Sequence, residues 1–142
     1  LFAFAPDVAP DDQDSPMWST LDRLQNDPNS PIKKSIENGF DPDDLLDLRA
    51  IYQQNFRAID FGSTHPALRP AKGRYGLTDY EKVFCADVKD APDIFDLRGI
   101  DRTQGALILV RPDQYISQIL PLDHLDVLFS HLKAVWSSTL GH

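Results

Sequence analysis

Residues 105–136 read GALILVRPDQYISQILPLDHLDVLFSHLKAVW and carry the clearest structural pattern in the chain. Residues 106–110 are a short apolar run with branched side chains, which is typical of a strand covered on both faces. Residues 111–114 place proline and aspartate in the order that a tight turn favours. Residues 115–120 then mix apolar and polar side chains as a second strand does. Together these segments predict an antiparallel hairpin.

A helix is predicted directly after this hairpin. Pro121 ends the second strand, and Asp123 can cap the helix that follows. Later apolar residues recur at a spacing that places them on one helical stripe: Leu125, Leu128, Phe129, Leu132, Val135 and Trp136. A hairpin followed by a helix that folds back over it is the unit that closes a thioredoxin-like fold.

The bulk composition limits the classes of function. A length of 142 residues suffices for one domain, and we expect residues 1–142 to form it. The net charge is −8, and an acidic surface repels phosphate, so nucleic acid is not an expected partner. No apolar run is long enough to predict a membrane span, and no signal peptide is visible. The single cysteine, Cys85, fits a cytoplasmic location.

The first forty residues predict one strand and two short helices. Residues 1–5 are typical of a buried strand, and an acidic loop with several prolines follows over residues 6–16. Residues 17–25 and 31–38 fit helices, because a serine–proline pair precedes each and proline is favoured in the first turn. The chain begins with leucine inside a predicted strand, so we expect it to be cut from something longer.

Residues 41–54 fit either a helix or a strand by their periodicity. We favour a strand at residues 47–53, because a strand, a helical crossover and a parallel strand form a βαβ unit that the hairpin extends. The sequence therefore predicts an α/β fold, thioredoxin-like, with a mixed sheet of about four strands flanked by helices. Residues 60–104 contain many turn signals and predict a long loop, which is usually functional or packed on a partner.

Three segments resemble a known family: residues 72–84 (KGRYGLTDYEKVF), 93–102 (DIFDLRGIDR) and 105–122. They are similar to the C-terminal domain of flavin-dependent aromatic hydroxylases of the phenol 2-monooxygenase and 3-hydroxybenzoate hydroxylase type. The string VRPDQY at residues 110–115, after a strand that a glycine introduces, is quite specific within that family.

The resemblance implies a thioredoxin-like domain at the end of a long flavoprotein, with FAD-binding and substrate domains upstream. It implies dimer contacts and packing on those domains rather than chemistry within the domain itself. FAD and NAD(P)H would then belong to the parent protein. The expected partners are the parent's other domains and a second protomer.

The residues themselves also argue against chemistry in this chain. A thioredoxin redox site needs two cysteines two residues apart at the start of a helix, whereas residues 15–20 read SPMWST. The proline that precedes the hairpin in thioredoxins is replaced by Gln104 and Gly105. A dinucleotide site needs a Gly-x-Gly-x-x-Gly turn, and the nearest string is Gly73-x-x-Gly76. We therefore predict no catalytic, cofactor-binding or metal-binding residue here.

Several single side chains have a functional and a structural interpretation. Cys85 fits a small buried residue better than a reactive thiol. His124 and His131 are seven residues apart, wider than a helical metal pair, and fit an exposed helix face. His65 precedes a proline and fits a loop, and His142 is terminal.

Charged and aromatic residues supply the candidate interface. Asp79 and Glu81 resemble an acid–base pair, but a capping box from Thr78 to Glu81 at a short helix explains them more simply. A basic cluster in the loop fits a salt-bridged segment docking on an acidic face, and charges around Asp101 fit a network that fixes the entry to the hairpin. A tryptophan beside a methionine in the first helix fits a protein contact. The possible interface residues are Trp18, Arg69, Lys72, Arg74, Arg98 and Arg102.

Two functions follow from these observations. The first is a non-catalytic dimerisation and packing domain of a flavin-dependent aromatic-ring monooxygenase, whose parent protein hydroxylates a phenol or hydroxybenzoate with NAD(P)H and O2. The alternative is a free-standing, redox-inactive, thioredoxin-like module that binds another protein.

Overall fold

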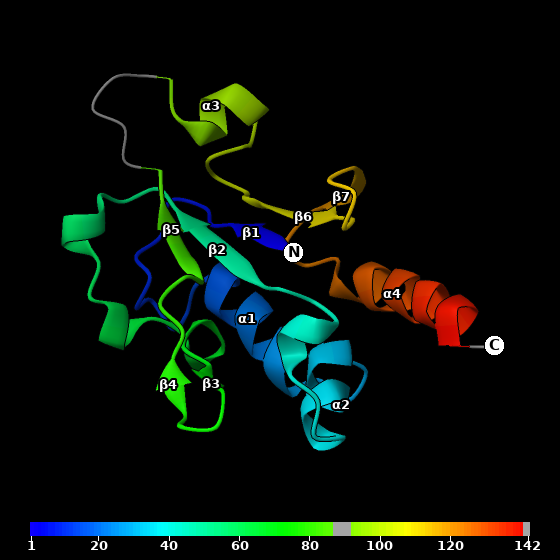
Figure 1. Ribbon diagram of the computed structural model, residues 1–142. Coiled ribbons are helices and arrows are strands. Elements are labelled where there is room, and N and C mark those ends of the chain that lie inside the picture. The colour runs from blue at the N-terminus through cyan, green and yellow to red at the C-terminus, as the bar shows by residue number, and fades with distance from the viewer. Residues whose placement is uncertain (87–91, 141–142) are drawn as a thin grey trace.

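The computed structural model describes residues 1–86 and 92–140. A five-stranded mixed sheet lies at the centre, with helices on both of its faces (Figure 1). The strands, in their order across the sheet, are β5 (Val83–Cys85), β2 (Arg49–Tyr52), β1 (Phe2–Phe4), β6 (Ala106–Val110) and β7 (Ile116–Leu120). The α-helices are α1 (Pro16–Asn26), α2 (Pro31–Glu37), α3 (Ile94–Arg98) and α4 (Leu125–Leu140).

Shorter elements occupy the segment that was predicted as a long loop. A two-stranded ribbon pairs β3 (Ala71–Lys72) with β4 (Leu77–Thr78). Two 3-10 turns lie in the same segment, η3 (Phe61–Ser63) and η4 (Pro66–Leu68), and two precede it, η1 (Pro42–Asp44) and η2 (Phe56–Ala58). This segment is therefore more regular than its turn signals indicate.

The strand directions confirm the predicted α/β, thioredoxin-like arrangement. Strand β1 runs parallel to β2 and antiparallel to β6, and β6 pairs with β7 as an antiparallel hairpin. This is a βαβ unit followed by a hairpin and a closing helix. The prediction of about four strands was short by one, because β5 adds a fifth, parallel to β2. Three residues among turn signals give too weak a pattern to predict a strand.

The helix boundaries follow local sequence signals. Ser15 Oγ accepts a hydrogen bond from the Trp18 backbone N–H at 3.1 Å, so serine caps α1 as the serine–proline pair predicts. Helix α2 begins at Pro31, and Gly39 adopts a φ of +77° just beyond its end. Helix α4 begins at Leu125, one residue later than a cap at Asp123 requires.

Gly105 allows β6 to approach β1 closely. Its φ is +66°, and a Cβ atom at this position would lie 2.3 Å from the Phe4 carbonyl oxygen. Only glycine fits a left-handed conformation with so near a backbone neighbour. The glycine that introduces the strand is thus required by the contact between β6 and β1.

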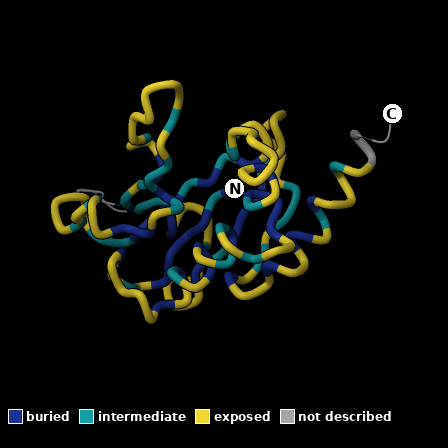
Figure 2. Tube along the Cα trace, turned by 90° about the horizontal axis from the view of Figure 1, so that it is seen from below, coloured by how far each residue is buried: buried dark blue, intermediate teal, exposed yellow. Residues whose placement is uncertain are grey.

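The two faces of the sheet are covered to different extents. The larger core lies between the sheet and helices α1, α2 and α4, and includes Leu21, Leu24, Leu125 and Leu128, each fully buried. Figure 2 shows buried positions along the central strands and the inner sides of these helices. On the opposite face a smaller cluster forms under the five-residue helix α3, where the rings of Phe4 and Phe95 meet edge to face at 5.3 Å.

Candidate interaction surfaces

A buried lysine joins three segments on the side of the larger core. Lys82 is 3% exposed, and its Nζ lies 2.5 Å from carboxylate oxygens of both Asp43 and Asp47. Burial alone would raise the pKa of Asp47, but hydrogen bonds from Lys82 and Arg49 outweigh burial and hold that pKa below its usual range. Lys72 donates to Asp43 as well. This lysine–carboxylate cluster ties η1 and the start of β2 to the residue before β5.

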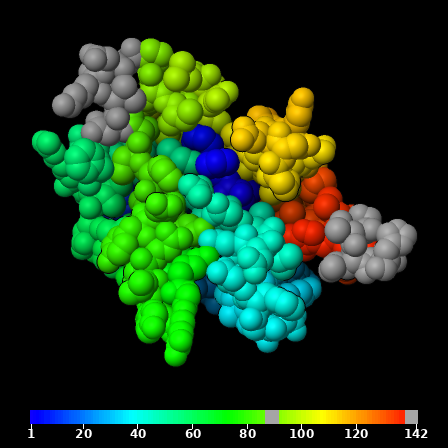
Figure 3. Space-filling model, in the orientation of Figure 1, coloured from blue at the N-terminus to red at the C-terminus, as the bar shows by residue number. Residues whose placement is uncertain are grey.

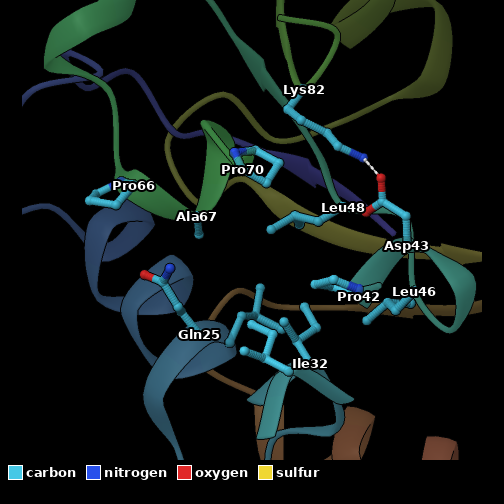
Figure 4. Close-up of a pocket in the computed structure, with 12 residues that line it drawn as sticks. Gln25, Ile32, Pro42, Asp43, Leu46, Leu48, Pro66, Ala67, Pro70 and Lys82 are labelled. Carbon is cyan, nitrogen blue, oxygen red and sulfur yellow. Dashed lines mark hydrogen bonds and ion pairs between the residues drawn. The ribbon is translucent and has the colours of Figure 1, made fainter. Parts of the chain in front are cut away.

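A cavity of about 180 Å³ adjoins this cluster (Figure 4). Lys82 and Asp43 meet at one end of it, while proline and leucine side chains form most of the remaining wall, among them Pro42, Leu48 and Pro70. The lining contains no serine, cysteine or histidine. Its two charged groups already pair with each other, which is typical of a structural ion pair.

A larger open groove of about 920 Å³ lies between α2 and α4. Phe40 and Leu45 stand exposed along it, and Trp136 lines it while half-buried. Ser35 also lines the groove, and its buried Oγ has no hydrogen-bond partner among the described residues. The groove combines apolar walls with lysines and aspartates.

The outer face of the hairpin is apolar and exposed. Ile116 and Ile119 on β7 are 57% and 63% exposed. Register pairing places Ile119 opposite Ile108 and Ile116 opposite Val110, so both isoleucines share the face that carries α3. We call the side of the sheet formed by the exposed Ile116 and Ile119 and by their less exposed neighbours Phe2, Val110 and Ile108, of which Ile108 is buried, the β6–β7 face.

The ribbon of β3 and β4 forms a third exposed surface. Tyr75, Leu77 and Tyr80 are each more than two-thirds exposed. The Arg74 guanidinium lies over the Tyr75 ring at 5.7 Å, and the Tyr80 ring packs against Phe61 at 4.8 Å. Figure 3 shows this green ribbon projecting from the lower edge of the molecule.

Metal and membrane features were sought in the same part of the chain. Within residues 1–86 and 92–140, no group of three or more His, Cys, Asp or Glu side chains is placed to hold a metal ion. No described helix combines the length and the apolar character that crossing a bilayer requires.

Comparison with known families decides what kind of domain this is. The model of the family described as "Phenol hydroxylase, C-terminal dimerisation domain" matches residues 1–139. The chain belongs to this family. The match covers nearly the whole chain, and thus both the βαβ unit and the hairpin with its closing helix.

Two curated relatives match this phenol hydroxylase-type domain over a small part of their own length. The 3-hydroxybenzoate 4-monooxygenase of Comamonas testosteroni is 45% identical over 126 residues, which is 87% of this chain and 20% of that protein. The FAD-dependent monooxygenase terD of Aspergillus terreus is 32% identical over 97 residues, which is 66% of this chain and 16% of that protein. The chain thus spans a fifth or less of each relative.

Three predicted interface residues of the phenol hydroxylase-type domain make contacts within the domain. The Trp18 ring packs edge to face on His65 at 4.7 Å. Lys72 pairs with Asp41 at 2.8 Å within the lysine–carboxylate cluster. Arg102 pairs with carboxylates on α3 and its cap, at 2.6 Å to Asp93. The structure does not bring these three side chains into one patch with the others, and their role at an interface stays a prediction.

The remaining predicted interface residues lie apart from one another. Arg69 Nε donates to the Thr64 carbonyl oxygen at 3.1 Å, so it fixes the turn at η4. Arg74 is exposed on the ribbon, and Arg98 is exposed in the last turn of α3. The arginines therefore mark separate elements rather than a single docking site.

Several side-chain interpretations need correction. No helix begins at Thr78, because β4 ends there; Asp79 Oδ1 instead accepts a hydrogen bond from the Glu81 backbone N–H at 2.8 Å. The predicted capping box is therefore wrong. Asp101 accepts hydrogen bonds from the Thr103 N–H and hydroxyl, which caps a turn, while Arg102 pairs elsewhere.

The histidines and the cysteine also differ from their simplest interpretation. His65 lies at the start of η4 but is 2% exposed, and its Nδ1 accepts a hydrogen bond from the Ala67 N–H. His131 is half-buried and faces β7, where its Nε2 lies 3.0 Å from Ser117 Oγ. Cys85 is half-buried in the edge strand β5. His142 lies outside the described residues.

Two features were missed by the sequence analysis. Lys82 gives no periodic signal, although the excess of aspartate at positions 41–47 indicates that a cation is needed nearby. Ile116 and Ile119 were taken as strand residues without a face. The sequence did contain a signal for exposed apolar residues, because strand β7 lies at the edge of the sheet and carries apolar side chains on both of its faces.

Proposed function

We propose that this domain joins two protomers of a flavin-dependent aromatic-ring monooxygenase and packs on that enzyme's FAD-binding and substrate domains. The observation that carries the proposal is the family match over residues 1–139, a family described as a dimerisation domain. The 45% identity with a 3-hydroxybenzoate 4-monooxygenase supports an aromatic acid or phenol as the parent's substrate.

The geometry supports a mechanical role for the domain. The two cysteines of a thioredoxin site are replaced at the start of α1, where residues 15–20 read SPMWST. The charged groups at the smaller cavity pair with each other instead of facing it. In contrast, large apolar side chains stand exposed on the ribbon, the groove and the β6–β7 face. Exposed apolar patches of this kind mark protein contacts.

The cofactors belong to the rest of the parent protein in this proposal. FAD would be held by an upstream domain, and NAD(P)H would reduce it there during hydroxylation with O2. Residues 1–142 would be the single C-terminal domain of that flavoprotein, working in the cytoplasm. The FAD-dependent relative supports this assignment by its printed name.

The test compares the protein from the complete reading frame with residues 1–142 alone. The long protein is expected to carry bound flavin, to oxidise NAD(P)H when phenol or 3-hydroxybenzoate is present, and to sediment as a dimer. Residues 1–142 alone are expected to bind no flavin and to oxidise no NAD(P)H. A flavin-loaded preparation of the short chain contradicts the proposal.

A different result would favour the alternative function. A reading frame that starts near Leu1 with its own initiation codon, and whose product binds another protein, indicates a free-standing thioredoxin-like module. Insulin reduction by either protein would indicate thiol chemistry, which a chain with one cysteine is not expected to support.

A further inference from the structure

Strand β7 presents two of its three apolar side chains to solvent and its polar side chains to the protein, while Leu120 packs against the larger core. Ser117 and Gln118 face helix α4, where both contact the imidazole of His131. Ile116 and Ile119 face the opposite way and are more than half exposed. A strand that covers a core normally shows the reverse arrangement, with polar residues toward water. The exposed isoleucines therefore indicate that another protein surface covers this side of β7.

A register shift makes this arrangement possible. Leu109 pairs with Gln118, but Val110 pairs with Ile116, so Ser117 is an extra residue on β7. Without that extra residue, side chains three positions apart would point to opposite faces of the sheet. The irregularity thus places Ile116 and Ile119 on one face.

The exposed isoleucines extend a larger apolar surface. Ile108 and Phe2 are directly paired on β6 and β1, and Ile119 continues their row onto β7. Helix α3 covers the other part of this face, where Phe95 contacts Phe4. Figure 1 shows α3 over the part of the sheet that lies away from β7, and Ile108 of β6 belongs to the buried cluster beneath α3. The β7 part of the β6–β7 face, with Ile116 and Ile119, is therefore the part of this sheet face that α3 leaves open.

The charge of the chain favours this face for contact with an identical chain. The net charge is −8, so two copies repel each other through most surfaces. Neither β6 nor β7 contains a charged residue, and Ile116 and Ile119 on β7 are exposed. An isologous contact joins a patch to itself, and an uncharged patch does so without like-charge repulsion.

The rival surfaces are less suited to self-association. The groove between α2 and α4 carries Lys34, Asp44, Asp126 and Lys133 around its apolar residues. The ribbon is convex and needs a concave receptor rather than a copy of itself. Strand β7 is also the last strand of the sheet, so its outer edge has no neighbouring strand within the described part of the chain.

We propose that the β6–β7 face packs against the β6–β7 face of a second copy of this chain, and that Ile116 and Ile119 lie at the centre of the contact. The inference rests on the proposed function, because it names the surface that a dimerisation domain of this family uses. Each isoleucine then meets apolar side chains of the partner, and a two-fold axis repeats every contact.

The test uses the protein from the complete reading frame and two matched double variants. Ile116→Lys with Ile119→Lys adds two positive charges to the β6–β7 face. Phe40→Lys with Leu45→Lys adds two positive charges to the groove, where the side chains are 63% and 42% exposed. The dimer dissociation constant of each is measured by sedimentation velocity over a dilution series, with bound flavin and circular dichroism as checks of folding.

We expect the β6–β7 variant to raise the dissociation constant at least about a hundredfold, because four lysines meet across the two-fold axis. The groove variant is expected to dissociate like the unmodified protein. A milder pair, Ile116→Thr with Ile119→Thr, keeps branched side chains for the strand and should raise the constant about tenfold. This second variant keeps the test valid where lysines disturb folding.

The outcomes separate this inference from the proposed function. If the β6–β7 variant stays as dimeric as the unmodified protein, the inference is wrong, and an upstream domain or the groove makes the dimer contacts. The dimerisation role of the protein is not contradicted by that result. If only the groove variant dissociates, the inference is likewise wrong and the groove makes the dimer contacts. An unmodified protein that is monomeric at all concentrations contradicts the dimerisation role itself and, with it, the inference.

Discussion

Both faces of the central sheet carry buried apolar side chains, but helices cover the two faces to different extents. On one face helices α1, α2 and α4 cover the strands, and nineteen buried residues form a single core. On the other face α3 has only five residues, and the buried cluster beneath it has five members. Three helices cover the first face, whereas a single short helix covers the second.

The closed face of the sheet stabilises the chain, whereas the open face is available to a partner. Burial of apolar area contributes roughly 25 cal/mol per Å² removed from water, so the closed face supplies most of the stability of the isolated chain. The open face keeps Ile116 and Ile119 exposed and contributes little until a partner covers them. Substitutions on the two faces should therefore affect different measurements.

The largest effect is expected in the closed core. Leu125→Ala removes a fully buried side chain from the first turn of α4, and we expect a loss of about 3 kcal/mol in the free energy of unfolding, because the cavity cannot be refilled. Urea denaturation followed by circular dichroism measures this loss. Val127→Ala on the same helix, at a position 49% exposed, is the matched control and should change stability by less than about 0.5 kcal/mol. Equal losses in both variants would mean that α4 does not close the core.

The lysine–carboxylate cluster is the second test of the closed side. Lys82→Met leaves Asp43 and Asp47 without the cation that both contact at 2.5 Å. Breaking a buried pair costs about 3–5 kcal/mol, but both carboxylates remain partly exposed, so we expect a loss of about 2 kcal/mol at pH 7. Lys34→Met, at an exposed position in α2, is the control for loss of one charge and should be nearly neutral.

Acid provides a check on the origin of that loss. The pKa of Asp47 is held below its ordinary value of 3.8 in the folded chain, so its contribution to stability is present above about pH 4 and disappears as the pH falls through the lowered pKa. The difference in stability between Lys82→Met and the unmodified chain should therefore shrink below pH 4. A difference that stays constant down to pH 3 would show that lost packing, rather than lost charge pairing, explains the variant.

The sequence was informative where the signal is local. The hairpin, α1 and α4 follow from apolar periodicity, proline positions and a serine cap, and each forms within a few residues of its predicted bounds. Strand β5 was not predicted, since a three-residue strand depends on the neighbour β2 to supply its hydrogen bonds. Its own residues carry too little information to define it.

The surfaces were predictable only in part. Basic residues were predicted as interface candidates because a basic cluster can dock on an acidic face and a charge network can face another domain, yet Lys72 and Arg102 form ion pairs with carboxylates of this domain. The exposure of Ile119 depends on how far α3 extends over the sheet, which is a tertiary property. Sequence periodicity assigns a residue to a face, but it does not say whether that face is covered.

A smaller, pH-dependent effect is expected at His65, which packs on α1 at the closed side. Burial lowers the pKa of His65 from 6.5, although Asp22 opposes the shift. The unfolded chain therefore binds a proton more readily, and this part of the stability is present above about pH 7 and is lost as the pH falls toward the lowered pKa. The side chain of His65→Asn cannot titrate, but it keeps an oxygen that can accept the Ala67 N–H. The difference in the free energy of unfolding between this variant and the unmodified chain should therefore narrow from pH 7.5 to pH 5.5.

Urea denaturation at several pH values measures this difference. His124→Asn, at an exposed position before α4, is the matched control and should leave the pH profile unchanged. If the difference in stability between His65→Asn and the unmodified chain is the same at every pH, then the pKa of His65 is the same in the folded and unfolded chains, and its burial does not govern the profile.

The smallest loss in the free energy of unfolding is expected for a substitution on the open face. This measurement tests whether Ile119 is exposed to solvent in the free chain. Ile119 and Ile108 are direct partners across the hairpin on the same face, but Ile119 is 63% exposed and Ile108 is 8% exposed. At a concentration where the chain is monomeric, Ile119→Thr should change the free energy of unfolding by less than about 0.5 kcal/mol, whereas Ile108→Thr should cost about 2 kcal/mol. Threonine keeps the branched shape that a strand favours, so the contrast reports burial rather than strand propensity. Equal losses at the two positions would mean that part of this chain already covers β7, and that no surface remains there for a second copy.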